Sequence, residues 1–388
     1  MPFSLEDGMF VPREVSMRSS RLSIGAATAA TLAGLVVVAA CGGAPGGASP
    51  SGIDASSTPP PVVATASPPP TDQPSTTPGS FEPVRLALDW TPNTNHTGFF
   101  VADASGWYAD AGIDLQVLPY ANTTPETLMA ADQADCGISF QDSLTFAVAA
   151  GLPLRSVMAI LQHTASAIAV LASSPIARPR DLDGRVYAGF GYPNEVPTLD
   201  AVIRADGGTG TFDVVTLDAT AYEALYSGAA DFTIPFTAWE GVEATERGID
   251  LRYFRFEDYG FPDFYQVVLA CSEGWLAAHP AAARAFVGAT VRGFEVAADH
   301  PEDAAAILIS ANPGVFDANP ALALDSARFL ATGGYYVDAG GWIGRQTLEE
   351  WTAYSSFLFA EGLLTGPEGQ TLVAPPDYAD LFTNEFLP

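Results

Sequence analysis

The stretch from Val84 to Tyr120 constrains the fold of this chain more than any other segment. Residues 84–90 alternate apolar and polar side chains as a half-buried strand does, and residues 97–108 carry apolar side chains at helical spacing. A second strand is predicted at residues 115–118. This order of strand, polar loop, helix and strand predicts a parallel βαβ unit. Because ligands of open α/β sheets bind at the loops after the strands, residues 89–96 are the first candidate binding segment.

Strand and helix patterns alternate along the rest of the chain and divide it into two parts. The pattern breaks near residues 171–175, and residues 267–271 form another buried strand that is followed mostly by amphipathic helix. The simplest arrangement is a first lobe of residues 81–172 and 267–388, with a second lobe of residues 173–266 inserted between them. The chain then crosses twice between the lobes, and these crossings form a hinge beside a ligand cleft.

Seven segments carry a resemblance to a known family. In order along the chain they are DWTPNTNHTGFFVA, CGISFQD, ILQHTASA, YAGFGYPNE, TAWEGVEA, DYGFPDFYQVV and FTNEFLP. They resemble, at similar spacing, the thiamine-pyrimidine-precursor binding proteins of bacterial ABC importers, a family that also includes riboflavin-binding importer components and a fungal pyrimidine synthase. The resemblance covers residues 82–388. It implies an α/β, two-lobed periplasmic-binding-protein fold of type II, with a ligand cleft between lobes joined by a two-strand hinge.

The first eighty residues are predicted to be an export signal followed by a tether. Arg18 and Arg21 precede the apolar run 24–40, which is typical of an export signal. The run ends in small residues before Cys41, a sequence that resembles the bacterial lipoprotein cleavage box. We therefore expect residues 1–40 to be a signal peptide and Cys41 to be lipidated. Residues 41–80 are rich in Pro, Ser and Thr without an aromatic residue, and we expect a disordered tether.

Composition argues against several classes of partner and cofactor. A formal net charge of −29 argues against nucleic acid and anionic membrane surfaces. The chain contains no lysine, which excludes Schiff-base chemistry with pyridoxal phosphate and a P-loop. The iron-binding cysteine run of the fungal synthase has no counterpart either, and the four histidines lack the spacing of a metal site. We expect neither cofactor nor metal.

Cys136 and Cys271 are the only cysteines after Cys41, and each lies in an apolar, strand-like run. An exported protein could pair them, but connectivity does not follow from sequence. Our expectation is two buried free thiols.

Candidate ligand contacts in the first lobe follow the ends of three predicted strands, which open on one edge of the sheet. They are Asp89, Trp90, Asn93, Asn95 and His96 in the first loop, Gln141 and Asp142 after the run CGISF, and His163 after the run AILQ. Each polar residue alone would be explained by turn chemistry. Their convergence at successive strand ends favours a binding role.

Candidate contacts in the second lobe combine aromatic rings with carboxylates. The segment Gly189–Pro193 lacks the third glycine of a nucleotide fingerprint, and we expect its glycines to let backbone approach a flat ligand while a ring covers the ligand's face. Core packing of these rings is the alternative. Stacking of a base on an aromatic ring contributes about 1–3 kcal/mol. The expected contacts are Phe190, Tyr192, Glu195, Trp239, Glu240, Tyr259, Phe261 and Asp263.

The resemblance implies a transport role, and the residues limit the kind of ligand. Only Arg185 and Arg255 lie near the motif loops, so a phosphorylated ligand is disfavoured. The expected function is a lipid-anchored binding component that delivers a neutral heteroaromatic vitamin, preferably riboflavin, to ABC permease and ATPase subunits at the extracytoplasmic face of the cell membrane. The alternative ligand is a thiamine pyrimidine precursor, hydroxymethyl- or formylamino-pyrimidine. A remote alternative is an extracytoplasmic pyrimidine-processing enzyme, for which the sequence offers no evident nucleophile beside His96 or His163.

Overall fold

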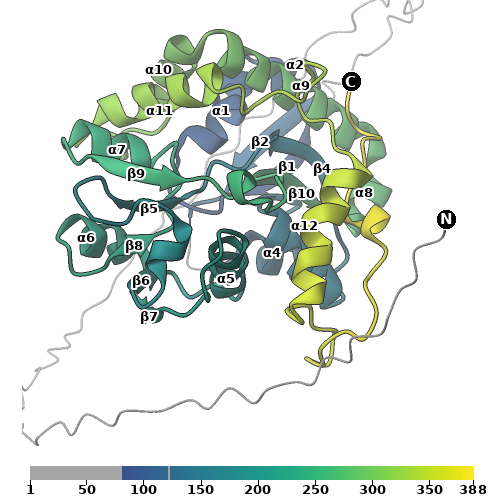
Figure 1. The fold of residues 1–388 in the computed structure, drawn as a ribbon. Helices are drawn as coiled ribbons and strands as arrows, with labels where there is room; N and C mark the ends of the chain where they lie inside the picture. Colours follow the sequence, from purple (N-terminus) through teal and green to yellow (C-terminus); the bar gives the residue numbers. More distant parts are fainter. Residues whose placement is uncertain (1–80, 121–122) are drawn as a thin grey trace, which may run out of the picture. The chain divides into compact units, whose positions relative to one another are not determined.

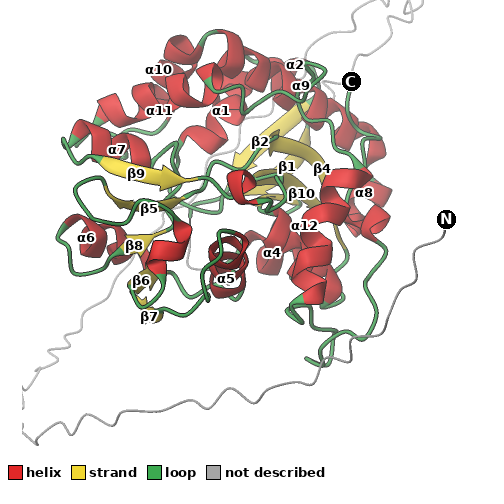
Figure 2. Cartoon of the chain, viewed as in Figure 1, coloured by secondary structure: helices red, strands yellow, loops and turns green. Residues whose placement is uncertain are grey.

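The computed structural model describes residues 81–120 and 123–388 (Figure 1). The predicted signal peptide of residues 1–40, the lipidation site Cys41 and the tether of residues 41–80 lie outside the described residues. The described part of the chain contains two five-stranded sheets with helices packed on them (Figure 2). No helix in these ranges combines the length and the apolar character that a membrane crossing requires.

The first sheet has the strand order β2-β1-β3-β10-β4. Strand β1 is parallel to β2 and β3, whereas β10 is antiparallel to both of its neighbours. Strands β3 and β10 are buried almost throughout, as their unbroken apolar sequences predict. The strands are β1 (Glu82–Ala87), β2 (Ile113–Val117), β3 (Cys136–Ser139), β4 (Leu154–Leu161) and β10 (Val267–Ser272).

The two faces of this sheet carry separate helix layers, because successive side chains of a strand point to opposite faces. One face packs Phe99 and Phe286 onto Leu86, and the other packs Leu144 and Trp351 onto Ala87. The helices of this part are α1 (Thr97–Ala104), α2 (Trp107–Asp110), α3 (Pro125–Ala130), α4 (Gln141–Ala149), α8 (Glu273–Ala278), α9 (Pro280–Asp299), α10 (Pro301–Ala311), α11 (Pro320–Thr332) and α12 (Leu348–Ala360).

The second sheet has the order β7-β6-β8-β5-β9, with β5 antiparallel to β8 and β9. Leu199, Val202 and Ile203 of α5 pack on one face, where Tyr354 and Leu358 of α12 join the same apolar cluster. The elements are β5 (Ile168–Leu171), β6 (Val186–Gly189), α5 (Glu195–Ala205), β7 (Asp213–Thr216), α6 (Ala221–Tyr226), β8 (Phe232–Thr233), α7 (Glu240–Glu246) and β9 (Leu251–Phe254).

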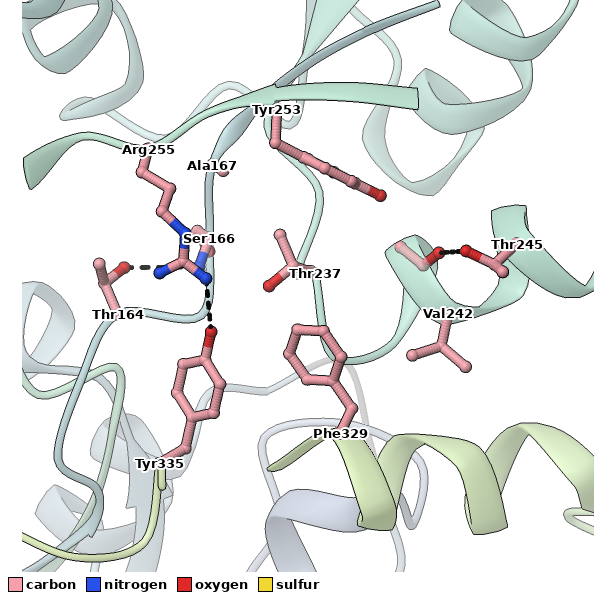
Figure 3. Close-up of a pocket in the computed structure, with 11 residues that line it drawn as sticks. Thr164, Ser166, Ala167, Thr237, Val242, Thr245, Tyr253, Arg255, Phe329 and Tyr335 are labelled. Atoms are coloured by element: carbon pink, nitrogen blue, oxygen red, sulfur yellow. Dashed lines mark hydrogen bonds between the residues drawn. The ribbon is translucent and has the colours of Figure 1, made fainter. Parts of the chain in front are cut away.

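The strand pairing moves one predicted lobe boundary. Residues 81–172 were assigned to the first lobe, but β5 pairs within the second sheet, so the boundary at residue 172 is wrong. The first crossing between the sheets joins β4 to β5 and the second joins β9 to β10. Figure 3 shows Thr164 and Ser166 on the first crossing and Arg255 on the second.

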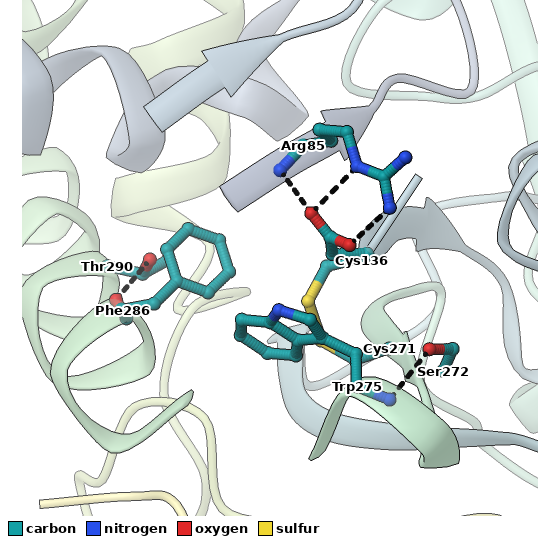
Figure 4. The surroundings of a disulfide bond; sticks show 8 residues. Arg85, Cys136, Cys271, Ser272, Trp275, Phe286 and Thr290 are labelled. Carbon is teal, nitrogen blue, oxygen red and sulfur yellow. Dashed lines mark hydrogen bonds and ion pairs between the residues drawn. A yellow bond between two sulfur atoms is a disulfide. The ribbon is translucent and has the colours of Figure 1, made fainter. Parts of the chain in front are cut away.

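A disulfide joins Cys136 of β3 to Cys271 of β10, and Trp275 lies beside it (Figure 4). The expectation of two free thiols is therefore wrong. The cysteines are 135 residues apart in sequence but are direct partners in the antiparallel register, a proximity that spacing could not reveal. The bond closes a loop that contains every strand of the second sheet.

Candidate functional site

A cavity of about 300 Å³ lies between the two sheets and receives side chains from both lobes and both crossings. Ten of the predicted contact residues line it: Asp89, Trp90, Asn93, Asn95, Asp142, Phe190, Tyr192, Glu195, Trp239 and Glu240.

The loop after β1 is held in shape by His96. Its fully buried ring accepts a hydrogen bond at Nδ1 from the backbone N–H of Asn93, at 3.1 Å, so Nε2 carries the proton. That Nε2–H donates to Oδ1 of Asp89 at 2.7 Å. The Asn93 side chain accepts in turn from the backbone N–H of Asn95. His96 does not line the cavity, and its role in this structure is to orient Asp89.

The glycine-containing loop after β6 is closed by Glu195. The Glu195 carboxylate accepts from the backbone N–H groups of Phe190 and Gly191, each at 3.0 Å. A Cβ atom at Gly189 would lie 2.4 Å from Oε2 of Glu195, and Gly191 has a φ of 92°, so both positions require glycine. Glycine at positions 189 and 191 therefore allows the loop backbone to approach the Glu195 carboxylate closely.

Asn194 connects the two lobes across the base of the cavity. Its Nδ2 donates to Oδ2 of Asp142 at 2.7 Å and to the hydroxyl of Tyr354 at 2.9 Å. Asn194 directly precedes α5 of the second lobe, whereas Asp142 lies in the first turn of α4. The side chain of Asn194 therefore links the second lobe to the first lobe by two hydrogen bonds.

Aromatic side chains line much of the cavity. Trp90 and Tyr192 are 46% and 63% exposed, although large apolar rings are normally covered. Tyr192 stacks on Phe190 with ring centroids 6.1 Å apart. Trp239 is half-buried and packs edge-on against Phe316 of the first lobe. The exposed rings provide faces on which a flat ligand could stack.

The cavity is acidic. Four carboxylates line it, from Asp89, Asp142, Glu195 and Glu240, and no arginine or histidine of the described residues does. Burial raises the pKa of Asp142, and it raises the pKa of Glu240 to about 7.

The Oδ1 atom of Asn95 is buried without a hydrogen-bond partner, which leaves an acceptor for a ligand donor. Within residues 81–120 and 123–388, no group of acidic, histidine or cysteine side chains has the arrangement of a metal site.

Six predicted contact residues lie away from the cavity lining, and we leave them out of the proposed site: His96, Gln141, His163, Tyr259, Phe261 and Asp263. Gln141 is fully buried and bonds to the backbone of α12 and of Tyr265. His163 and Asp263 bond to each other between the crossings, at 2.7 Å. Phe261 is buried and packs against the rings of Phe256 and Phe357.

Sequence reasoning missed part of the lining. Asn194 stood inside the quoted motif YAGFGYPNE, and its place just before a helix could have singled it out. Three more missed residues, Thr94, Phe140 and Ser143, lie in or beside the strand-end segments already singled out, next to residues that were predicted. The remaining missed residues come from the second lobe, the crossings and α12: Ser166, Thr198, Ala219, Tyr222, Ile234, Phe236, Phe256, Phe264, Gln266 and Tyr354.

Comparison with known proteins gives a consistent picture. The family described as "NMT1/THI5 like" matches residues 93–304. The formylaminopyrimidine-binding protein of Halalkalibacterium halodurans is 28% identical over 236 residues, covering 60% of this chain and 71% of that protein. The riboflavin-binding protein RibY of Chloroflexus aurantiacus is 26% identical over 320 residues, covering 80% and 87%.

A solved structure supports the fold. The alkanesulfonate-binding protein SsuA of Xanthomonas axonopodis superposes with a TM-score of 0.58 at 15% identity, covering 78% of this chain and 98% of that one. At this identity the match concerns the fold alone. The predicted α/β, two-lobed solute-binding fold is confirmed.

Proposed function

The chain belongs to the NMT1/THI5-like family, and from this premise we propose that it is the substrate-binding component of an ABC importer for a neutral, flat heteroaromatic vitamin. The observation that carries the proposal is the interlobe cavity, which is rich in aromatic rings and carboxylates and is lined by no arginine or histidine of the described residues. Rings stack on the faces of a flat ligand, and carboxylates accept from its N–H or O–H groups. A phosphate group would meet like charge and no guanidinium.

Riboflavin is the favoured ligand. Its three fused rings offer the stacking area that Trp90, Tyr192 and Trp239 present from two lobes. Its uncharged hydroxyl chain supplies donors for Asp89 and Asp142, which line the same cavity. RibY, at 26% identity, is named for this vitamin.

A thiamine pyrimidine precursor is the second candidate, and a specific observation favours it. A volume of about 300 Å³ is at the small end for ligand pockets, which span roughly 300–1,000 Å³, and a single-ring ligand fits it readily. The relative that is 28% identical is named for formylaminopyrimidine. An amino group on such a ring would donate to the same carboxylates.

A direct titration decides between these ligands. The full chain is titrated with riboflavin, riboflavin phosphate, hydroxymethylpyrimidine and formylaminopyrimidine, following flavin emission and calorimetric heat. The proposal expects riboflavin to bind more tightly than its phosphate and its fluorescence to be quenched. Submicromolar pyrimidine binding without a response to riboflavin would transfer the assignment to the pyrimidine. Chemical conversion of either ligand on prolonged incubation would support the enzyme alternative instead.

The anchor and the transport partners belong to the same proposal. Lipidation of Cys41 would hold the folded lobes at the extracytoplasmic face of the membrane, beside the permease that the ATPase subunits drive from the other side. Membrane fractionation tests the anchor, because the Cys41→Ala chain should move to the soluble exported fraction. Retention of that variant in the membrane would contradict a lipid on Cys41.

A further inference from the structure

Negative charge reaches the ligand cavity from both lobes. Its four carboxylates belong to four different elements: Asp89 follows β1, Asp142 lies on α4, Glu195 begins α5 and Glu240 begins α7. A sphere of the cavity's volume, about 300 Å³, has a radius of about 4 Å, so a charge bound there lies close to several of these groups. The formal net charge of −29 adds to the same negative potential.

The other titratable groups at the cavity do not offset this charge. No arginine or histidine of the described residues lines it. His96 lies behind Asp89, and its ring is neutral because Nδ1 accepts from the backbone N–H of Asn93. Burial raises the pKa of the lining tyrosines, so their hydroxyls stay uncharged near neutral pH: Tyr192, Tyr222 and Tyr354. A negative charge brought into the cavity therefore meets no cation of the described residues.

The cavity suits hydrogen-bond donors instead. Asp89 accepts from His96, and Glu195 accepts from two backbone N–H groups of the loop after β6, which is how an ionised carboxylate bonds. Asn95 is only 6% exposed, and its Oδ1 atom has no partner. An anionic ligand would add like charge to these acceptors in a partly buried space, where repulsion is stronger than in water.

This difference bears on the redox state of the ligand, and the inference rests on the proposed function because it concerns riboflavin. Oxidised riboflavin is neutral and carries N–H and O–H donors. Uptake of two electrons and two protons gives the neutral hydroquinone, which releases one proton from its ring system near neutral pH and becomes an anion. We propose that the acidic cavity selects the oxidised form of the vitamin and binds the anionic hydroquinone more weakly.

Separate titration of the two redox forms tests the proposal. The full chain is titrated without oxygen with oxidised riboflavin and with electrochemically reduced riboflavin, following calorimetric heat. At pH 8 the hydroquinone anion should bind about tenfold more weakly than the oxidised form. For a two-electron couple, this ratio lowers the midpoint potential of the bound flavin by about 30 mV, which spectroelectrochemistry measures independently.

The pH dependence separates charge from shape. At pH 5.5 the hydroquinone is largely neutral, so its affinity should approach that of oxidised riboflavin. The ring system also bends on reduction, and a bent ligand could stack less well on the aromatic walls whatever its charge. A tenfold preference that is the same at pH 5.5 and pH 8 would assign the effect to shape and overturn the inference.

Variants that remove one charge at a time locate the effect. Asp89→Asn and Glu195→Gln each keep an oxygen that can accept the existing hydrogen bonds, and each should reduce the preference at pH 8 by about threefold. The matched control is Glu295→Gln, because Glu295 is exposed on α9 and does not line the cavity. Circular dichroism checks the fold, and if one cavity variant fails to fold, the other carries the comparison. An unchanged preference in the folded cavity variants would contradict the proposal.

The proposed function and this inference fail separately. Absence of riboflavin binding at both pH values would remove the favoured ligand and the inference together. Tight binding of oxidised riboflavin with equal affinity for the hydroquinone at pH 8 would leave the proposed function intact and overturn the inference alone.

Discussion

Substitution of Trp90 should weaken ligand binding while leaving the stability of the free protein almost unchanged. It lines the cavity yet is 46% exposed, so the fold gains little from its burial. Trp90→Ala should weaken riboflavin binding by about tenfold to a hundredfold, the equivalent of one lost stacking contact. Calorimetric titration measures this loss, and thermal unfolding of the free protein should remain nearly unchanged. A large drop in melting temperature with normal affinity would identify Trp90 as a packing residue.

Trp239 should behave differently although it lines the same cavity. Its ring packs on Phe316, at 6.5 Å between centroids, and joins a buried cluster that includes Phe100. Trp239→Ala should therefore lower both the ligand affinity and the stability of the free protein, the latter by roughly 1–3 kcal/mol. Urea unfolding without ligand, beside the same titration, measures the two losses. An unchanged unfolding free energy would show that the contact with Phe316 contributes nothing.

Glu240 should make stability depend on pH. Burial raises the pKa of its carboxyl from 4.5 to about 7, although the backbone N–H of Phe236 donates to it. The folded chain thus holds this proton more tightly than the unfolded chain. The stabilising contribution is complete below pH 4.5 and is lost as the pH rises through about 7. The expected loss is of the order of 2–3 kcal/mol.

Comparison with Glu240→Gln isolates this effect, because Asp142 and Glu126 also have pKa values raised by burial. Urea unfolding at pH 4.5 and pH 8 should show a smaller decrease in stability for the variant than for the wild type. Parallel pH profiles for the two chains would mean that folding does not raise the pKa of Glu240.

At the scale of elements, the disulfide between β3 and β10 should contribute much of the stability. It closes a loop of 135 residues, and in the chain-entropy description such a loop corresponds to about 5 kcal/mol. Both cysteines are fully buried, so a Cys136→Ala and Cys271→Ala double variant keeps their small size without introducing a polar group. Urea unfolding should show a loss of several kcal/mol. A loss below 1 kcal/mol would show that packing alone holds the two strands together.

Local sequence patterns predicted where strands and helices occur, but they did not predict which sheet each strand joins. The alternation in residues 84–90 predicted β1, but the strand ends at Ala87, which leaves Asp89 and Trp90 in the loop. The helix expected over residues 97–108 is two helices, because Gly106 adopts a φ of 75° between them. The assignment of β5 to the first lobe failed for a different reason. Periodicity identifies a strand, but only tertiary contacts decide which sheet it joins.

The candidate site shows the same limit. Strand-end loops led to Asp89 and Asp142, which do line the cavity, because parallel strands place such loops at one edge of the sheet. Periodicity could not show that His163 and Asp263 bond to each other between the crossings. It also gave no sign that Tyr354 on α12 reaches the cavity, since that depends on packing between segments distant in the chain.

At the scale of the whole molecule, the position of the lobes should depend on Asn194. It donates to Asp142 and Tyr354 across the cavity, and its side chain makes no capping bond to α5, so substitution leaves that helix start unaltered. Asn194→Ala removes the bridge, whereas Asn194→Asp replaces it with a carboxylate that faces Asp142. Like charges at this distance repel, and the repulsion weakens when either group is protonated.

Asn194→Asp should therefore open the lobes more than Asn194→Ala at pH 7.5, lengthening the distance between spin labels on the two lobes. Riboflavin affinity should fall about tenfold in the aspartate variant and less in the alanine variant. The difference between the variants should shrink at pH 4.5, because burial raises the pKa of Asp142 and favours its neutral form. Identical interlobe distances in both variants and the wild type would show that packing, rather than this bridge, holds the lobes in the observed arrangement.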